Sequence, residues 1–230
     1  ADHLILDDTA FIKVCYEAFD FVRKHNALIT LGIKPLRPNT GYGYIQIELQ
    51  SVSDNVYQVK TFTEKPNLEL AKAFIASGDF LWNAGIFAWQ VKNIIHAFEM
   101  HLPEIAEVFD TERGKLNGPE ENDAIKRIYP QCTNISIDFG VMEKARNVYV
   151  MSAEFGWSDL GTYGSLYEHI RHDDKHNAVV GKNVMLYDSF NCIVNVPKNK
   201  LIVLKHLLPR TVTNAPLRAL HVPRNGVGYY

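Results

Sequence analysis

The sequence predicts an α/β fold that is followed by a small β unit. Through most of the chain, segments with a helical repeat of apolar residues alternate with short, continuous apolar runs, as in domains built around a parallel sheet. From Asp173 onward the helical repeat stops, and short β segments separated by Asn, Gly and Asp turns replace it. We therefore expect one domain over residues 1–172 and the start of a β-rich domain over residues 173–230.

The first elements follow from the spacing of apolar residues. A short apolar run at residues 4–6 precedes Asp7, Asp8 and Thr9, which supply the cap of a helix that ends near Asn26. ALITLGI, at residues 27–33, is a continuous apolar run typical of a buried parallel strand. After a loop rich in proline and glycine, YIQIEL and VYQVKTF predict strands at residues 44–49 and 56–62.

The same alternation continues beyond these strands. Asn67 caps a predicted helix over residues 68–77, and Gly78 ends it. WNAGIFAWQV is a predicted strand, and VKNIIHAFEMHL and DAIKRIY are predicted helices on either side of an acidic surface stretch. Ser136 caps a short helix through FGVMEKA, NVYVMSAEF returns to the sheet, and GWSDLGTYGSLYEHI is a further strand, loop and helix. Three prolines in residues 206–230 predict a poorly ordered tail.

The composition is that of an ordinary globular protein. Hydrophobic residues make up 47% of the 230 residues and charged residues 22%, and the formal net charge is -2, so a broad basic face for nucleic acid is missing. No apolar run reaches the roughly 20 residues that a membrane span needs, and ADHLILDDTAF lacks the basic region of a signal peptide. We therefore expect a cytoplasmic protein that binds neither nucleic acid nor membrane.

The cysteines and histidines form no recognisable disulfide or zinc pattern. The three cysteines lack CxxC spacing, so buried thiols are expected at Cys15, Cys132 and Cys192. Three histidines lie close together at His169, His172 and His176. Their setting, HIRHDDKH, is a charged helix end that runs into a loop, which favours solvated surface over a metal site.

Polar strand ends are the candidate sites, because ligands of parallel sheets bind beyond the carboxyl ends of the strands. Four stand out: TGYGYI, FTEKP, WNAG and GWSD. In FTEKP the carboxylate of Glu64 suits a pair of sugar hydroxyls, and the ammonium of Lys65 suits a phosphate. Pro66 disfavours the α conformation at Lys65 and helps to fix the direction in which the strand ends. From this stretch alone, a surface ion pair between Glu64 and Lys65 is an equally good interpretation.

The other three strand ends also allow two interpretations each. Gly41 and Gly43 suit either a ligand that lies against the backbone or a tight turn. Asn83 can donate to and accept from a hydroxyl, although Asn-Ala-Gly is more often a turn. Asp159 is at a usual place for a helix cap, but together with Asp2 and substrate phosphates it would suit Mg²⁺, which usually takes one or two carboxylates.

In this order, TGYGYI, FTEKP, WNAGIF, SIDFGVMEKA and GWSDLGTY resemble the mannose-1-phosphate guanylyltransferase family, over residues 1 to about 205. The resemblance implies a Rossmann-like, GT-A-like nucleotidyltransferase domain and a smaller β domain, often a left-handed β-helix. It also implies the transfer of GMP from GTP to mannose 1-phosphate, giving GDP-mannose and pyrophosphate. The protein would bind these two substrates and would use Mg²⁺ as its cofactor. The resemblance leaves open whether it forms a homo-oligomer.

Residue roles are implied by the same resemblance. Glu64 and Asn83 would bind sugar hydroxyls, and Gly43 would let the sugar approach the backbone. Lys65 would hold the sugar phosphate and act as a catalytic group. For Asp138 the resemblance implies one of two roles: it would either border the sugar pocket or cap its helix. The cap is ranked higher.

The metal site and the chain ends complete this interpretation. Asp2, in what resembles the end of the family's P-(S/A)-D-H motif, and Asp159 would hold Mg²⁺, and Asp159 would be a second catalytic group. The family's glycine-rich GGxGxRLWP-type loop, which holds the triphosphate, has no counterpart in these residues, so we expect poor binding of GTP. The residues after Lys205 also depart from the family's β pattern. Two other functions stay open: a related transferase with another nucleotide or sugar, and a non-catalytic subunit that senses sugar nucleotides.

Overall fold

The structure is a computed structural model of the chain, and it describes residues 3–161, 167, 169–197, 199–207 and 211–213. The chain divides into two compact units. The larger unit is Ile5–Trp157, and the smaller unit combines Ala1–Leu4 with Ser158–Tyr230. This division falls earlier in the chain than the boundary at residues 172 and 173 that the change of composition predicts.

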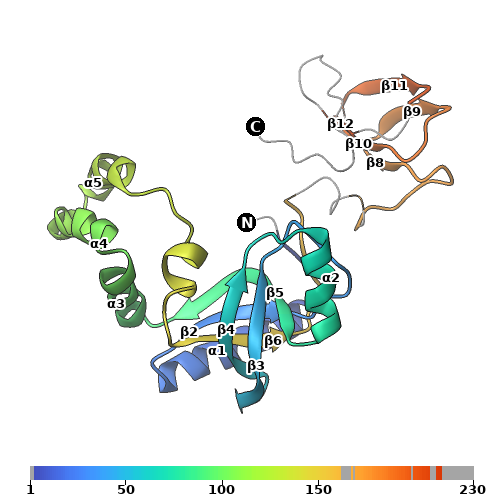
Figure 1. The fold of residues 1–230 in the computed structure, drawn as a ribbon. Helices are drawn as coiled ribbons and strands as arrows, with labels where there is room; N and C mark the ends of the chain where they lie inside the picture. Colours follow the sequence, from blue (N-terminus) through green and yellow to red (C-terminus); the bar gives the residue numbers. More distant parts are fainter. Residues whose placement is uncertain (1–2, 162–166, 168, 198, 208–210, 214–230) are drawn as a thin grey trace. The chain divides into compact units, whose positions relative to one another are not determined.

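Five strands form the centre of the larger unit: β2 (Leu28–Ile33), β3 (Tyr44–Ser53), β4 (Val56–Thr63), β5 (Phe80–Trp89) and β6 (Val148–Ala153) (Figure 1). They pair in the order β2-β5-β3-β4-β6, and β6 pairs with β2 to close the ring. Among these five strands, β2 and β6 run parallel, whereas the other four pairings are antiparallel. The expectation of a mostly parallel sheet is therefore wrong for this part of the fold.

The antiparallel pairing of β3 with β4 has a local cause in the sequence. Asp54 and Asn55 join the two strands, Ser53 pairs with Val56, and Asn55 has a φ of 57°. Two-residue hairpin turns need a positive φ, which Asn adopts more readily than most residues. The turn therefore returns the chain alongside itself, and no crossover helix is needed to reach the next strand.

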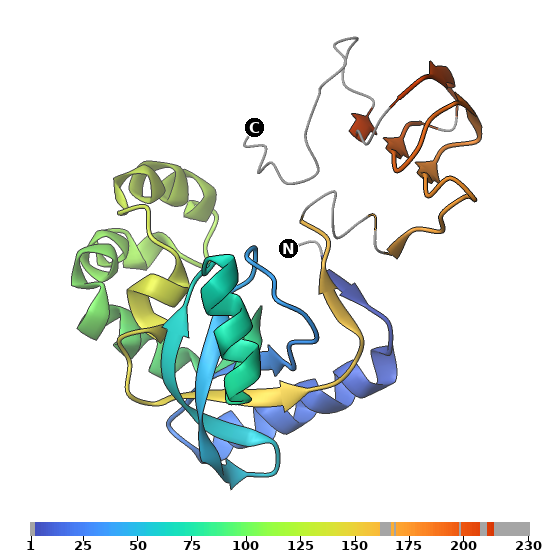
Figure 2. The ribbon, with the colours of Figure 1, turned by 45° about the vertical axis from the view of Figure 1, so that its right-hand side comes forward.

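Two helices have the boundaries that their caps predict. Helix α1 (Asp8–Lys24) begins where the side chain of Asp7 accepts a hydrogen bond from the Ala10 backbone N–H at 2.9 Å. Its buried residues pack with those of β2, β5 and β6, and Figure 2 shows α1 alongside β6. Helix α2 (Leu68–Ser77) begins in the same way at Asn67 and ends at Gly78, whose φ is 78°. Both predicted caps are confirmed.

The remaining helices of the larger unit follow β5. Helices α3 (Val91–His101), α4 (Pro103–Asp110) and α5 (Glu121–Ile128) gather on one side of the strands (Figure 1). Helix α4 and the 3₁₀ turn η1 (Arg113–Lys115) lie in the stretch that was predicted as an acidic surface, and a second 3₁₀ turn, η2 (Tyr129–Gln131), follows α5. The predicted short helix after Ser136 is a π-helix, η3 (Asp138–Met142).

The smaller unit is built from short strands. Strand β1 (His3–Ile5) pairs with β7 (Trp157–Asp159). Further along, five strands pair in parallel in two groups, β12-β10-β8 and β11-β9. Their bounds are β8 (Ala178–Val180), β9 (Asn183–Tyr187), β10 (Ile193–Asn195), β11 (Leu201–Lys205) and β12 (Thr211–Thr213). Parallel pairing between successive short strands is the pattern of stacked β-helix coils.

Two predictions for this unit have mixed outcomes. Strand β12 shows that the predicted tail, residues 206–230, is wrong for Thr211–Thr213, whereas residues 208–210 and 214–230 lie outside the described residues. Most of the helix predicted in GTYGSLYEHI also lies outside them. None of the three cysteines forms a disulfide bond in the structure; burial is confirmed for Cys192, while Cys15 and Cys132 are partly exposed.

The described residues contain neither a membrane-spanning helix nor a cluster of metal ligands. No helix there is long and apolar enough to cross a membrane. In the same part of the chain, no group of three or more His, Cys, Asp or Glu residues could hold a metal ion. His172, from the histidine-rich segment, has its Nε2 atom 2.7 Å from the carbonyl oxygen of Tyr167.

Candidate functional site

Four of the residues singled out in the sequence lie together in the larger unit: Gly43, Glu64, Asn83 and Asp138. Gly43 directly precedes β3, Glu64 directly follows β4, Asn83 lies in β5, and Asp138 opens η3. The backbone N–H of Asn83 donates to the carbonyl oxygen of Gly43 at 2.8 Å, and Asn83 Nδ2 donates to Asp138 Oδ1 at 2.8 Å. The closed ring of strands therefore brings together residues that are far apart in the sequence.

Asn83 is held in one orientation by its hydrogen bonds. Its Oδ1 accepts from Thr30 Oγ1 at 3.0 Å and from the Gly85 backbone N–H at 3.1 Å. The Gly85 N–H can only donate, so the amide oxygen must face it and the amide nitrogen must face Asp138. The remaining Nδ2 hydrogen is a donor for a ligand. The expectation that Asn83 both donates to and accepts from a hydroxyl is therefore not favoured, because its oxygen already has two donors.

Gly43 leaves the space in which the carboxylate of Glu64 lies. A Cβ atom at position 43 would be 2.6 Å from Glu64 Oε2 and 3.5 Å from Asn83 Cβ. The first distance is far inside van der Waals contact, so any side chain at this position would displace the carboxylate. Gly43 is not among the glycines with positive φ, so the interpretation as a turn that needs positive φ is wrong. A ligand that lies against its backbone stays a prediction.

Lys65 shows the ion pair that was weighed against a binding role. Its Nζ lies 3.5 Å from Glu64 Oε1, with the side chains of Lys65 and Glu64 66% and 30% exposed. Lys65 has a φ of 45°, which lies in the left-handed region, so the extended backbone of β4 does not continue through this residue. Such a backbone costs on the order of 1 kcal/mol for a residue with a Cβ atom. Strain of this kind is frequent at binding sites.

Glu143 belongs to this neighbourhood although the sequence reasoning did not select it. Burial raises the pKa of its carboxyl above the ordinary value, the charges of Asp138 and Glu64 raise it further, and Lys144 opposes them. Three carboxylates therefore act on one another around Asn83. The signal was present in the sequence, because Glu143 lies in the SIDFGVMEKA segment together with Asp138.

Aromatic residues support the backbone beside Gly43 and Asn83. The ring of Tyr42 packs edge-on against Trp82 at 5.1 Å and against Trp157 at 5.3 Å between centroids. Tyr42 and Trp82 are 8% and 6% exposed, and each directly precedes one of the two site residues in the sequence. Buried, interlocked rings hold a backbone rigidly. The sequence placed a tryptophan beside this asparagine but did not predict the cluster.

Of the two acids predicted to hold a metal, the structure describes only Asp159. Asp2 lies outside the described residues. Asp159 ends β7, and its Oδ1 accepts a hydrogen bond from the Gly161 backbone N–H at 2.8 Å. This is an Asx-type turn, as the cap interpretation implies. The turn uses only Oδ1, so it leaves Oδ2 of Asp159 available to another partner. One carboxylate oxygen fits a Mg²⁺ ion that takes its other ligands from phosphates and water.

The fold and the arrangement around Asn83 define a class of protein. Residues 1–176 match the family described as Nucleotidyl transferase, so the chain belongs to that family. Its Rossmann-like nucleotidyltransferase domain and the β unit that follows are therefore as the sequence predicted.

The similar proteins narrow this class. The chain is 31% identical over 217 residues to a mannose-1-phosphate guanylyltransferase of Escherichia coli, covering 89% of the chain and 46% of the relative. It is 33% identical over 198 residues to that of Klebsiella pneumoniae, covering 85% and 42%. The resemblance to this family is confirmed, and the chain spans less than half the length of these relatives.

Two solved structures are similar as well. A structure from Thermus thermophilus, described as mannose-1-phosphate geranyltransferase, has a TM-score of 0.78 at 30% identity and covers 97% of this chain and 64% of that one. A structure from Helicobacter pylori, described as mannose-6-phosphate isomerase, has a TM-score of 0.56 at 28% identity and covers 69% and 62%. The first likeness includes both units of the chain, since it covers nearly all of it.

Proposed function

We propose that this chain is part of a mannose-1-phosphate guanylyltransferase, an enzyme that transfers GMP from GTP to mannose 1-phosphate. The group formed by Gly43, Glu64, Asn83 and Asp138 carries this proposal, because donors and acceptors at fixed spacing suit the hydroxyls of a hexose. The relatives that share the chain's sequence bear the same activity in their names. Sugar phosphates and nucleoside triphosphates are intracellular metabolites, so we also propose a cytoplasmic location.

Each residue of the group has a role in binding the sugar. Glu64 and Asp138 accept hydrogen bonds from hydroxyls, and the free hydrogen on Asn83 Nδ2 donates one. Asp138 already holds Asn83 at 2.8 Å, so it both positions the amide and borders the sugar. This geometry supports the border position of Asp138 over the helix cap. Glu143 adds negative charge around the hydroxyls, and this favours neutral donors over anions at this end of the pocket.

Lys65 is the group that meets the sugar phosphate. In the structure it pairs with Glu64, and a phosphate would replace the carboxylate as its partner. Releasing Glu64 frees the carboxylate oxygens for the sugar, so the two changes support each other. The ammonium thus lies between the sugar hydroxyls and the phosphate, where it lowers the repulsion between two anionic reactants.

The reaction forms one bond and breaks one. An oxygen of mannose 1-phosphate attacks the α-phosphorus of GTP, and the bond from that phosphorus to the bridging oxygen of pyrophosphate breaks. Lys65 holds the attacking phosphate in place and screens its charge. Asp159, with Asp2, would hold a Mg²⁺ ion, which when bound neutralises phosphate charge.

Calorimetry on the present chain tests the sugar site. Mannose 1-phosphate should bind weakly, and Lys65→Ala should reduce the affinity roughly tenfold or more, since a charge-assisted contact is lost. Lys72→Ala is the matched control, because Lys72 is an exposed lysine that pairs with Glu69 at 3.4 Å on α2. Equal affinity in the wild type and Lys65→Ala, or no binding by either, contradicts the site.

The full protein that contains this chain tests the reaction. Release of pyrophosphate should require GTP, mannose 1-phosphate and Mg²⁺ together. Equal turnover with UTP and glucose 1-phosphate would instead indicate a transferase with another nucleotide and sugar. Binding of sugar nucleotides without any turnover would indicate a sensing subunit.

A further inference from the structure

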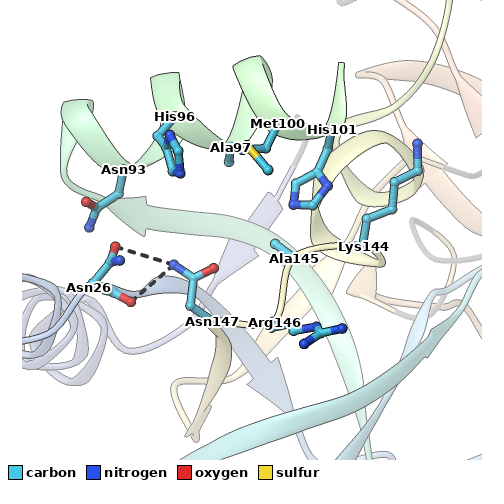
Figure 3. A pocket seen from close by; sticks show the side chains of 10 residues that line it. All are labelled: Asn26, Asn93, His96, Ala97, Met100, His101, Lys144, Ala145, Arg146 and Asn147. Atoms are coloured by element: carbon cyan, nitrogen blue, oxygen red, sulfur yellow. Dashed lines mark hydrogen bonds between the residues drawn. The ribbon is translucent and has the colours of Figure 1, made fainter. Parts of the chain in front are cut away.

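A second pocket, of about 330 Å³, lies in the larger unit and shares no residue with the group around Asn83 (Figure 3). One wall is helix α3. The opposite wall is formed by Asn26, which lies shortly before β2, and by the segment that joins η3 to β6. Its lining residues from α3 include Asn93, His96, Met100 and His101, and those from the other wall include Asn26 and Arg146. A hydrogen bond from Asn147 Nδ2 to the Asn26 carbonyl oxygen, at 3.1 Å, joins the two segments of that wall.

Asn93 offers this pocket a hydrogen-bond donor that lacks a partner. The residue is 9% exposed, and its Nδ2 is buried with no hydrogen-bond partner among the described residues. Figure 3 shows its side chain directed from α3 toward the wall that contains Asn26. Buried amide donors are almost always satisfied in native proteins. An unpaired donor at the wall of a pocket therefore indicates an acceptor that a ligand would bring.

Like Asn93, the charged and titratable side chains that line the pocket can donate hydrogen bonds, and two of them are cations. Lys144, Arg146, His96 and His101 line it, and Arg146 has no carboxylate within 4.0 Å among the described residues. Two acids that do not line the pocket neighbour its lining residues: Glu99 is 3.6 Å from His96 Nδ1, and Glu143 precedes Lys144. The lining itself contains no Asp or Glu, so it favours an anion.

The remaining lining residues are the amides Asn26 and Asn147 and three apolar side chains. Ala97, Met100 and Ala145 face the pocket, and Ala97 also packs into a buried cluster with Leu28 and Val148. The volume is near the lower end of the roughly 300–1,000 Å³ that small-molecule sites occupy. The pocket thus combines an anion-binding rim with a small apolar surface, in which Ala97 is buried and Met100 is 62% exposed.

We propose that this pocket is a second ligand site, and that it binds a small phosphorylated metabolite. The phosphate accepts hydrogen bonds from Arg146 and His101, and the carbon part lies against Ala97 and Met100. Asn93 is eight residues before His101 on α3, about 12 Å along the helix axis, so it donates to an oxygen at the other end of the ligand. A phosphate suits the cationic end better than a carboxylate, because its three terminal oxygens can accept from a guanidinium and an imidazole at once. The site goes beyond the proposed transferase function and does not depend on it.

The test uses the 230-residue chain and follows the imidazole signals of His96 and His101 by NMR. Inorganic phosphate and glycerol 3-phosphate are titrated at constant ionic strength, with chloride as the reference anion. Both should shift the two signals in a saturable way, and glycerol 3-phosphate should bind more tightly because of its carbon part. Arg146→Ala should weaken both affinities roughly tenfold. Arg146 is exposed, so its removal leaves the fold intact.

Two controls separate this site from others. Arg113→Ala removes an exposed arginine that pairs with Asp110 outside the pocket and should leave the titration unchanged. Lys65→Ala should also leave it unchanged, whereas it weakens mannose 1-phosphate at the sugar site, so the two proposals fail separately. The proposal is overturned if chloride gives the same shifts as phosphate, if no saturable shift occurs, or if Arg146→Ala binds phosphate as the wild type does.

Discussion

At the scale of single residues, Gly43 is the position where a small change should affect binding without affecting stability. In Gly43→Ala the added Cβ would lie 2.6 Å from Glu64 Oε2, and the free end of that side chain can move away. The fold should therefore keep its thermal stability, while the affinity for mannose 1-phosphate should fall roughly tenfold as the carboxylate is displaced. Calorimetry and thermal unfolding measure the two effects.

Gly114→Ala is the control for that substitution. Nothing lies within 4 Å of a Cβ atom built at Gly114, so neither binding nor stability should change beyond a few tenths of a kcal/mol. If Gly43→Ala bound the sugar phosphate as tightly as the wild type, Glu64 would not contact the sugar from the position it has here.

The group around Asn83 also shows how far single residues could be predicted. Gly43, Glu64, Asn83 and Asp138 were selected from short motifs, and the fold brings the four together. The sequence could not show that Asn83 Oδ1 is already occupied by Thr30 and Gly85, because that depends on how β2 pairs with β5. For the same reason Glu143 was missed: its raised pKa comes from burial and from neighbours that only the fold supplies.

At the scale of elements, Glu112 fastens η1 to α5, and this contact should be visible in the pH dependence of stability. Its oxygens lie 2.7 Å from Lys115 Nζ and 3.1 Å from Arg127 Nε. Hydrogen bonds from Arg127 and Lys115 lower the pKa of Glu112 from 4.5 to about 2. Because the folded pKa is below the unfolded one, the ionised carboxylate stabilises the fold above pH 4.5. That contribution is lost as the pH falls toward 2.

Glu112→Gln should therefore lower the thermal midpoint at pH 7, and the difference from the wild type should shrink steadily as the pH falls below 4.5. Thermal unfolding between pH 7 and 3 measures it. Glu69→Gln is the matched control, because Glu69 is 86% exposed and pairs with Lys72 alone at 3.4 Å. A difference that stays constant across this range would show that the ion pairs do not stabilise the fold.

In the smaller unit, Asn177 plays a comparable part for the β segments. It is 1% exposed, its Nδ2 donates to Asp173 Oδ2 and to the Ser189 carbonyl oxygen, each at 3.0 Å, and its Oδ1 accepts from the Cys192 N–H at 2.9 Å. Asn177→Ala leaves buried backbone groups unpaired, so it should destabilise this unit by about 1–3 kcal/mol. Chemical denaturation measures the loss. Asp174→Ala, an exposed neighbour, should change stability little, and an equal loss there would contradict the role of Asn177.

Elements themselves were predicted well and their pairing poorly. Helices α1 and α2 begin and end where Asp7, Asn67 and Gly78 indicate, since caps are local. The sheet was expected to be parallel because strands and helices seemed to alternate, yet Asp54 and Asn55 make a hairpin of β3 and β4. Strand direction depends on these short connections, so a two-residue Asp-Asn turn should have outweighed the alternation. Helix α4 was missed although Ile105, Val108 and Phe109 have the spacing of an apolar helix face, because its acidic residues suggested a surface stretch; no residue of it is buried.

At the scale of the whole molecule, the two units have separate cores. Every buried hydrophobic cluster among the described residues draws its members from one unit alone. Cooperative unfolding follows such contiguous cores. We therefore expect calorimetry to show two unfolding transitions in the intact chain, one for each unit.

Two substitutions assign these transitions. In Gly32→Ala the new Cβ would lie 2.5 Å from Val150 Cγ2 and 2.7 Å from Leu81 Cδ1, inside the core of the larger unit, and overpacking of this kind costs about 1–3 kcal/mol. It should lower one transition and leave the other unchanged, whereas Asn177→Ala should do the reverse. A single transition that both substitutions lower would instead mean that the units unfold together, and each substitution would then destabilise the sugar site and the β unit alike.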